Sequence, residues 1–594
     1  MVVQSKHFLN TAPSLVVDSL QGLCVLNPHL VLDTANKVVY LAEQDRTKVA
    51  LLCGGGSGHE PSHSGFVGHG ILTAAVCGTV FASPSSSQVR RAIDLLNNDK
   101  GTIIIVKNYT GDVLNFGLAK EQYSAIHPDK STRVRFIIVG DDVSVGRAQG
   151  NIVGRRGLAG VCLVYKIAGA LAARGGSLDE VFDVAAYVSS RLGTVGVGLE
   201  HCHVPGTAIP DTHLGIDEIE IGLGIHNERG HRRDSPVPPL NELIPKLLSM
   251  ITSTNDPDRS FVPFENNGTD RVVLLVNNLG GLSELELGAV VSEAKHTLDG
   301  KGITVMRVLA GTFMTSLNMP GFSLTLLLLP SAETSNNSSA EFLLSLLDHP
   351  TSAPGWKWSP KSPPLSTSQI ISPSISPSAN VPPATSQKFT LKAPDPASFN
   401  TSIERACKAL IAAEPEITKM DSIAGDGDCG LTLKDGASGV LKALEDGTVS
   451  GEDVVDSVIT ISKVAEEAMG GTSGALYSIF FASLAQALGQ TSCATTTSEV
   501  WSTALSSALA RLYTYTRARP PSRTLVDPLS AFVGAIHTGI ENAAKAASDA
   551  AEGTRNVEAK AGRSAYVDSE RLKAEKIPDP GAWGVKVIIE ALAS

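Results

Sequence analysis

The sequence predicts an α/β domain with two α/β subdomains, followed by an all-α bundle or barrel. In the first half, short uninterrupted apolar runs alternate with helical stretches, and such runs suit strands buried on both faces of a sheet. After residue 399 they give way to Ala- and Leu-rich stretches with apolar residues at three- and four-residue spacing, as in amphipathic helices. The predicted strands are residues 49–52, 102–106, 136–139 and 272–276.

Composition narrows the class of protein. The chain has 594 residues, too many for one ordinary core, and its net charge of -11 argues against a general nucleic-acid binder. No apolar run reaches the roughly 18 residues that suggest a membrane span. The eight cysteines are scattered, and the first residues lack a signal-peptide pattern, so we expect a cytoplasmic protein. Cys53, Cys77 and Cys162 lie in apolar, strand-like runs and are expected to be buried.

A Ser- and Pro-rich segment at residues 351–393 marks the main boundary, because such a composition cannot bury enough apolar surface to fold. Residues 1–350 form the predicted α/β domain, with a break between its subdomains near residues 190–215. Residues 394–594 form the predicted all-α domain. The helices expected there are residues 403–413, 454–468, 475–488, 501–515, 531–547 and 584–592.

The first strand runs into a glycine-rich turn, Gly54–Pro61, with the sequence GGGSGHEP. Backbone N–H groups in such a turn can cradle an oxygen-rich ligand, with His59 at its edge. The segment has neither the ending of a Walker motif nor the G-x-G-x-x-G spacing. The alternative interpretation is a tight turn between a strand and a helix.

Two further segments of this half carry polar side chains. Phe81–Ser85 offers hydroxyls for a polyol, although a helix N-cap is the better explanation for this segment taken alone. Lys107–Asp112, with the sequence KNYTGD, follows the strongest strand. There Lys107 is suited to hold a ligand oxygen and Asp112 to accept a hydroxyl proton. The alternative is a surface ion pair, which would contribute little.

A histidine between glycines is the most informative feature. His226 lies in Gly222–Gly230, with the sequence GLGIHNERG, just past the acidic run Asp217, Glu218 and Glu220. Glycines let the backbone pass close to a small ligand, and the imidazole can then act as a nucleophile towards an electrophilic carbon. The alternative is an ordinary histidine on a surface loop.

In the helical half, three carboxylates lie within eight residues of a glycine-rich turn. Asp421, Asp426 and Asp428 offer hard oxygen ligands that suit Mg²⁺ bound to nucleotide phosphates, although the spacing is not that of an EF-hand. The alternative is an acidic, solvated loop. Gly470–Gly474 opens a helical run and predicts an anion site at a helix N-terminus, or else close helix packing. Asp579–Gly581 predicts only a turn before the last helix.

Taken together, these segments strongly resemble the ATP-dependent dihydroxyacetone kinases of the two-domain type, also called triokinases. The resemblance spans both halves and excludes the linker. The markers are GGGSGHEP at 54–61, KNYTGD at 107–112, GLGIHNERG at 222–230, AGDGDCG at 424–430, GGTSG at 470–474, AGRSAYV at 561–567 and DPGA at 579–582.

The resemblance implies that His226 binds the carbonyl carbon of the substrate as a hemiaminal, which selects short ketones and aldehydes over glycerol. His59 and Asp112 would orient and deprotonate the hydroxyl that attacks ATP. Asp421, Asp426 and Asp428 would hold two Mg²⁺ ions. The implied substrate contacts are Gly56, Ser57, Gly58, His59, Ser83, Lys107 and Asp112. The implied nucleotide contacts are Asp428, Cys429, Gly430, Leu431, Thr432, Gly470, Gly471, Thr472, Ser473, Gly474, Arg523, Thr524, Asp579, Pro580 and Gly581.

Some positions depart from the family pattern. Pro521–Leu525 reads PSRTL where Gly-Asp-Arg-Thr-Met is usual, and Leu431–Thr432 stands where Thr-Thr is common. The resemblance also implies a homodimer. It leaves two other functions open, namely an FAD-cleaving lyase that forms cyclic FMN at the same nucleotide site and a triose-sensing regulator without catalysis. The fused helical domain with its three aspartates argues against the regulator.

Overall fold

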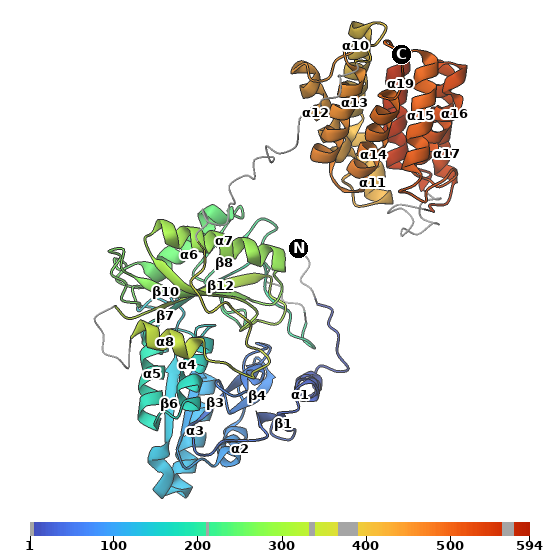
Figure 1. The fold of residues 1–594 in the computed structure, drawn as a ribbon. Helices are drawn as coiled ribbons and strands as arrows, with labels where there is room; N and C mark the ends of the chain where they lie inside the picture. Colours follow the sequence, from blue (N-terminus) through green and yellow to red (C-terminus); the bar gives the residue numbers. More distant parts are fainter. Residues whose placement is uncertain (1–4, 209–212, 332–338, 366–389, 561–574) are drawn as a thin grey trace. The chain divides into compact units, whose positions relative to one another are not determined.

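The computed structural model describes residues 5–208, 213–331, 339–365, 390–560 and 575–594. The chain divides into two compact units, Met1–Ser376 and Pro377–Ser594, which are described separately here (Figure 1). The first is α/β and the second is helical, so the predicted fold class is confirmed. Among the described residues, no helix is long and apolar enough to cross a membrane.

The first sheet of the α/β unit has the order β1-β2-β4-β3-β5-β6, and the four strands from β4 to β6 run parallel. Apolar residues alternate between its two faces. One face packs on α2 and α3, and the other packs on α1, α4 and α5. The elements are α1 (Leu15–Leu26), β1 (Leu30–Asp33), β2 (Val38–Leu41), β3 (Ala50–Ser57), β4 (Ala74–Val80), α2 (Ser86–Leu96), β5 (Thr102–Lys107), α3 (Thr110–Ile126), β6 (Val134–Val139), α4 (Val161–Ala173) and α5 (Leu178–Ser190).

The second sheet has the order β11-β10-β12-β7-β8-β9, and only β10 and β11 run parallel. Helices α6 and α7 cover one face, while the other face shares a core with α4 and α8, so one hydrophobic core joins the two sheets. The elements are β7 (Leu192–Gly198), β8 (Ile219–Ile221), β9 (Arg232–Asp234), α6 (Leu240–Thr252), β10 (Arg271–Asn278), α7 (Glu284–Gly300), β11 (Thr304–Gly311), β12 (Gly321–Leu328) and α8 (Ala340–Leu347).

The four predicted strands all form, as β3, β5, β6 and β10. Two other expectations, one about strand β6 and one about Cys162, are wrong. Strand β6 is an edge strand that pairs only with β5, and its Ile138 is exposed, so it is not buried on both faces. Cys162 is buried as expected but lies in helix α4, because an apolar run alone does not separate a buried strand from a buried helix.

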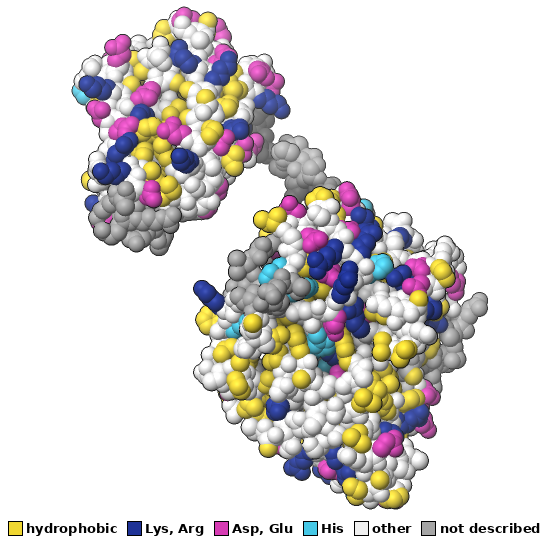
Figure 2. Space-filling view, turned by 180° about the vertical axis from the view of Figure 1, so that it is seen from behind, with side chains coloured by type: hydrophobic (Ala, Val, Ile, Leu, Met, Phe, Trp, Pro, Cys, Tyr) yellow, Lys and Arg dark blue, Asp and Glu magenta, His cyan; other side chains and the backbone are white. Residues whose placement is uncertain are grey.

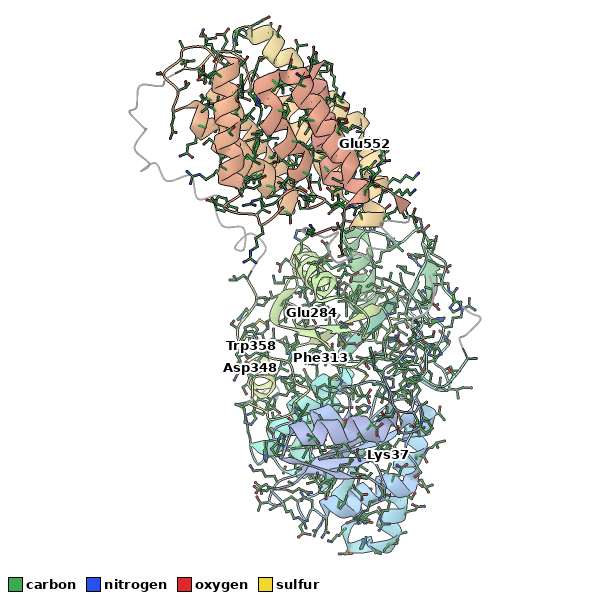
Figure 3. All side chains as sticks on the ribbon, turned by 90° about the vertical axis from the view of Figure 1, so that its right-hand side faces the viewer. Lys37, Glu284, Phe313, Asp348, Trp358 and Glu552 are labelled. Carbon is green, nitrogen blue, oxygen red and sulfur yellow. The ribbon has the colours of Figure 1, made fainter. Side chains whose placement is uncertain are left out.

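The start of the Ser- and Pro-rich segment packs on the α/β unit. The Gly355 amide donates to the Gly65 carbonyl at 2.7 Å, and the Trp356 ring lies 6.1 Å from Phe66 and 5.5 Å from Phe313. Figure 3 labels Phe313 in the middle of this unit. Near the other end of the segment, Leu391 is fully buried in the core of the helical unit. Each unit therefore reaches into residues 351–393.

The helical unit contains two helices that the sequence did not predict, α11 and α12, and the aspartate loop lies between them. The single helix expected at residues 531–547 is instead two, because a short 3-10 turn follows Ala535 and Gly539 adopts a φ of 112° directly before the second helix. The helices are α10 (Pro396–Ala412), α11 (Glu414–Ala424), α12 (Cys429–Glu445), α13 (Val454–Val464), α14 (Gly471–Leu488), α15 (Ser498–Leu512), α16 (Val526–Ala535), α17 (Ile540–Gly553) and α19 (Pro580–Ala593).

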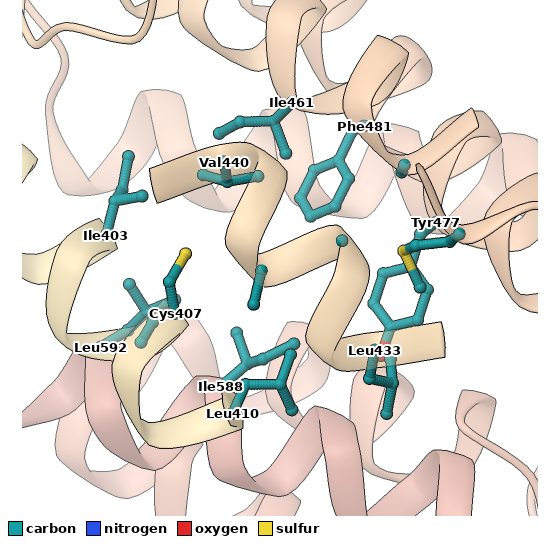
Figure 4. Close-up of a pocket in the computed structure, with 15 residues that line it drawn as sticks. Ile403, Cys407, Leu410, Leu433, Val440, Ile461, Tyr477, Phe481, Ile588 and Leu592 are labelled. Atoms are coloured by element: carbon teal, nitrogen blue, oxygen red, sulfur yellow. The ribbon is translucent and has the colours of Figure 1, made fainter. Parts of the chain in front are cut away.

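These helices surround an apolar interior that side chains do not fill. One cavity of about 150 Å³ is lined by Cys407, Leu433, Tyr477 and Ile588, among others (Figure 4). A second hollow of about 960 Å³ lies against α14, α15 and α19. The unit is therefore closer to a barrel than to a filled bundle.

Candidate active site

Two histidines from distant parts of the chain meet in the α/β unit. His59 follows β3, and His226 lies in the loop between β8 and β9. Their Nε2 atoms are 3.0 Å apart, and the rings meet edge to face. His59 Nδ1 lies 2.7 Å from the carbonyl oxygen of Thr315, and His226 Nδ1 lies 2.8 Å from Glu228 Oε1. Figure 2 shows one face of this unit, on which histidine side chains are visible beside charged residues.

The partners of the two rings fix where their protons lie. A carbonyl and a carboxylate only accept hydrogen bonds, so both rings donate from Nδ1. The two Nε2 atoms then need one more proton between them. Burial and the nearby charges of Lys107 and His226 lower the pKa of His59, so His59 Nε2 is suited to accept the hydrogen bond between the two rings. Although burial favours a neutral Glu228, the hydrogen bonds and charge of His226 lower the pKa of Glu228 to about 2, so the His226 ring faces a carboxylate.

Asp112 lies in the first turn of α3 and is buried, with 3% of its surface exposed. The Ser83 hydroxyl donates to Asp112 Oδ1 at 2.5 Å. Burial raises the pKa of Asp112, while Lys107 and the Ser83 hydrogen bond oppose that rise. The helix N-cap suggested for Phe81–Ser85 is also present. It is formed by Ser85, which precedes α2 and makes a capping box. Ser85 thus takes the N-cap role, whereas the contact of Ser83 with a polyol stays a prediction.

Lys107 ends β5 and is completely buried. Its Nζ has no hydrogen-bond partner among the described residues and lies 5.3 Å from the centre of the Tyr109 ring. Burial lowers the pKa of this amine, and the carboxylate of Asp112 opposes the shift. Because both charged groups are buried, a surface ion pair is excluded for Lys107 and Asp112.

The glycine-rich segment is not a free loop, since Gly54–Gly56 belong to β3. Gly58 adopts a φ of 102°, and a Cβ atom there would lie 2.8 Å from the Phe81 ring. Glycine therefore lets Phe81 stack on His59, with ring centres 5.2 Å apart. The Ser57 hydroxyl donates to the carbonyl of Gly78 at 2.9 Å, so its proton is used within the protein.

Sequence reasoning missed several residues of this site. Glu228 follows His226 by two positions, and a carboxylate so close to a candidate nucleophile was a usable signal. Thr315 comes from the connection between β11 and β12, 256 residues from His59, and no local pattern announces it. Tyr109, whose ring meets that of His226 edge to face at 4.6 Å, was quoted within a motif but given no role.

The helical unit brings the three aspartates together. One carboxylate oxygen from each of Asp421, Asp426 and Asp428 lies within 4.8 Å of the others. Asp421 is buried and accepts hydrogen bonds from the amides of Gly427 and Cys429, which holds the loop closed around it. Carboxylates this close repel one another unless a cation neutralises them, and this donor set fits Mg²⁺.

Three helix N-termini lie close to that loop. Asp428 precedes α12, Gly470 precedes α14, and Asp579 caps α19 through the amide of Ala582. Cys429 and Trp583, from the first turns of α12 and α19, and Tyr477, from the second turn of α14, pack on the same apolar cluster. Gly470 and Gly471 have positive φ angles, are exposed, and have open space where a Cβ atom would lie, so a ligand can approach the backbone there. Such a group of N-termini suits an anion. The marker at residues 561–567 lies outside the described residues.

The side chain of Arg523 is buried and hydrogen-bonded within the protein, which the sequence did not predict. It is 1% exposed and donates to the carbonyls of Thr554 and Ile577. Arg523 belongs to Pro521–Leu525, the segment that departs from the family pattern. The carboxylate of Asp527 stabilises this segment by accepting hydrogen bonds from the amides of Ser522 and Thr524. Burial raises the pKa of Asp579 to about 7, with Arg523 opposing and Asp527 and Asp421 adding to the rise.

Comparisons with known proteins match both units of the chain. The Dak1 domain matches residues 21–355, and the DAK2 domain matches residues 423–594. The dihydroxyacetone kinase of Komagataella pastoris is 42% identical over 99% of this chain and 98% of its own length. The chain belongs to the dihydroxyacetone kinase family. The human triokinase/FMN cyclase is 38% identical over 99% of both chains.

Solved structures of the family extend the comparison. The dihydroxyacetone kinase of C. freundii, in complex with AMP-PNP and Mg²⁺, matches with a TM-score of 0.63 and 29% identity over 99% of both chains. The dihydroxyacetone kinase operon co-activator DhaQ matches 58% of this chain with a TM-score of 0.51 and 31% identity.

We predict that Asp579→Asn alters how stability depends on pH. The pKa of Asp579 lies above its unfolded value of 3.8, so between about pH 4 and 7 the folded chain keeps a proton that the unfolded chain releases. The wild type should therefore lose stability relative to the variant by about 1.4 kcal/mol per pH unit as the pH rises through that window. Denaturant unfolding of the full chain, without nucleotide or divalent cations, measures this difference.

The matched control for this measurement is Asp549→Asn, on an exposed position of α17. Its unfolding free energy should differ from that of the wild type by the same amount at every pH. If the Asp579→Asn profile also runs parallel to that of the wild type, Asp579 does not carry a proton in the folded chain.

Proposed function

We propose that this member of the dihydroxyacetone kinase family transfers the γ-phosphoryl group of ATP to dihydroxyacetone and glyceraldehyde in the cytoplasm, with the triose held on His226 as a hemiaminal. The observation that carries the proposal is the His226–His59 pair. One imidazole is oriented by Glu228, its Nε2 faces a second imidazole, and the buried carboxylate of Asp112 shares the site.

The proton count of this pair suits capture of a carbonyl. His226 gives its Nε2 proton to His59, and the freed lone pair of Nε2 adds to the carbonyl carbon. The carbonyl oxygen then takes the proton from His59 and becomes the hydroxyl of the hemiaminal. When the pair starts with one proton between its two Nε2 atoms, its total charge is the same before and after capture, so capture needs no proton from solvent. Glycerol has no carbonyl and is not captured.

The transfer step needs a base and neutralised phosphates. Asp112 is suited to accept the proton of the attacking hydroxyl, since a carboxylate with a raised pKa is a stronger base. The Lys107 amine, which lacks a partner among the described residues, is suited to hold a substrate oxygen. In the helical unit, Asp421, Asp426 and Asp428 would hold Mg²⁺, which neutralises nucleotide phosphates when bound.

We predict ATP-dependent turnover with dihydroxyacetone and with D-glyceraldehyde, none with glycerol, and loss of turnover when Mg²⁺ is omitted. A coupled assay of ADP release, run side by side with the three substrates, measures this. Turnover of glycerol at a rate similar to that of dihydroxyacetone would contradict capture through a carbonyl. ADP release without a phosphorylated product would contradict the kinase itself.

The two parts of the site should fail differently. His226→Ala removes the anchor, so we expect the KM for dihydroxyacetone to rise more than kcat falls. Asp112→Asn removes the base while keeping the shape, so we expect kcat to fall roughly 100- to 10,000-fold with the unfolding transition intact. Steady-state kinetics of both variants test this. An unchanged KM with a collapsed kcat in His226→Ala would contradict the anchor.

A second candidate activity is cleavage of FAD to cyclic FMN at the nucleotide site. The observation that favours it is the 38% identity to proteins named triokinase/FMN cyclase. Incubation of the protein with FAD and Mn²⁺, followed by chromatography of the flavins, decides it. Absence of a cyclic flavin product rejects this activity and leaves the kinase proposal unaffected.

We further propose a homodimer, because the phosphate-binding and triose-binding groups lie in separate units of the chain. We expect sedimentation velocity to give twice the mass of the 62.0 kDa chain at concentrations where the kinase is active. A fully active monomer at those concentrations would contradict the dimer. A control run with ATP and Mg²⁺ shows whether ligands alter the association.

A further inference from the structure

Beneath the site lies a chain of three buried polar side chains with no role in the proposed chemistry. Cys53 Sγ lies 2.8 Å from the hydroxyl of Tyr165, and that hydroxyl lies 2.7 Å from His63 Nδ1. Cys53 and Tyr165 are fully buried, and His63 is 3% exposed. The three come from β3, α4 and the turn after β3, so the chain ties the sheet and a helix to the segment that carries His59.

The protons in this chain can be placed by counting donors and acceptors. Burial raises the pKa of the Cys53 thiol to about 12 and that of Tyr165 above its usual range, so both groups keep their protons. Imidazole nitrogen is a better acceptor than sulfur, so the Tyr165 hydroxyl donates to His63 Nδ1 and the thiol donates to Tyr165. Burial, together with the charge of Lys107, lowers the pKa of His63 and keeps its ring neutral. The single ring proton of His63 therefore lies on Nε2.

That Nε2–H group points to the side of the site where Asp112 lies. A Cβ atom built on Gly55 would lie 3.2 Å from His63 Nε2 and also 3.2 Å from Asp112 Oδ2, so the two atoms border the same small space. Among the described residues, His63 Nε2 has no hydrogen-bond partner, and the same holds for Lys107 Nζ. A buried donor left unpaired is unfavourable, and an oxygen of a ligand would relieve that cost.

We propose that His63 is a further substrate-binding residue, whose Nε2–H donates to an oxygen of the triose beside Asp112, and that Tyr165 and Cys53 are positioning residues that hold its tautomer. A hydroxyl in that space accepts from His63 and donates to Asp112 Oδ2, so its proton is directed at the base. The inference rests on the proposed function, since that supplies the triose.

The decisive variant is Tyr165→Phe, which removes the hydroxyl that fixes the tautomer and keeps the ring. We expect the ring of His63 to lose its single tautomer and kcat/KM for dihydroxyacetone to fall about threefold, while the KM for ATP stays unchanged. His63→Leu removes the donor itself, and loss of one hydrogen bond predicts a fall of about tenfold. His63→Gln, which restores an N–H donor, should recover part of that loss.

Nitrogen-15 NMR of the full chain labelled at histidine reads the tautomer directly, with the His63 signals assigned by their absence in His63→Leu. Tyr187→Phe is the matched control, because its hydroxyl, on α5, is likewise buried but, unlike that of Tyr165, has no hydrogen-bond partner among the described residues. That variant should match the wild type in spectrum and kinetics. If His63→Leu does not fold, the His63 signals are assigned by their absence in His63→Gln, and Tyr165→Phe still carries both measurements.

Two failures can be told apart. A wild-type chain that phosphorylates no triose contradicts the proposed function and, with it, the ligand assigned to His63. An active wild type whose Tyr165→Phe variant keeps the wild-type kcat/KM contradicts the contact of His63 with the triose alone. A wild-type spectrum in which His63 carries its proton on Nδ1 contradicts it as well.

Discussion

The hydrogen bond between His226 and Glu228 is the contact on which the candidate site depends. It lies within one turn, where Glu228 also accepts from the His226 amide and the Glu228 carbonyl accepts from the amide of Gly224. The turn can close this tightly because residue 224 is glycine, since a Cβ atom there would lie only 2.0 Å from Glu228 Oε2. With Nδ1 committed to a carboxylate, only Nε2 faces the site. The proposed roles of His59 and Asp112 depend on where that nitrogen lies.

The α/β unit accepts unpaired polar groups around this nitrogen. Lys107 Nζ, His63 Nε2 and the Tyr109 hydroxyl are buried, and within the part of the chain that the structure describes they find no hydrogen-bond partner. Each is unfavourable by about 1–3 kcal/mol. A core that joins both sheets, with helices packed on both faces of the first, supplies the apolar burial that outweighs such terms. Stability is thus held by the packing, and the unpaired groups are left for an oxygen-rich ligand to satisfy.

The sequence predicted those parts of the structure that local patterns encode. Buried apolar runs gave strands, and glycines beside charged residues marked both candidate sites. Helices α11 and α12 escaped because polar and charged residues flank the aspartate loop and mask the apolar period. Thr315 and Tyr165 escaped for a different reason, since each reaches its histidine across more than 100 residues, and such partners are chosen by the topology. The period of a sequence reports which face is buried but not what that face meets.

In the helical unit, the balance of charges makes the binding of an anion depend on a cation. The N-termini of α12, α14 and α19 attract negative charge, yet Asp421, Asp426 and Asp428 occupy the same end of the unit. Phosphates approaching alone would meet the helix dipoles and also three carboxylates, and full charges outweigh the half-charges of helix ends. A divalent cation reverses that balance, because it neutralises the carboxylates and leaves the N-termini unopposed. The anion is therefore a poor ligand without the cation, and by linkage bound phosphates also strengthen the binding of the cation.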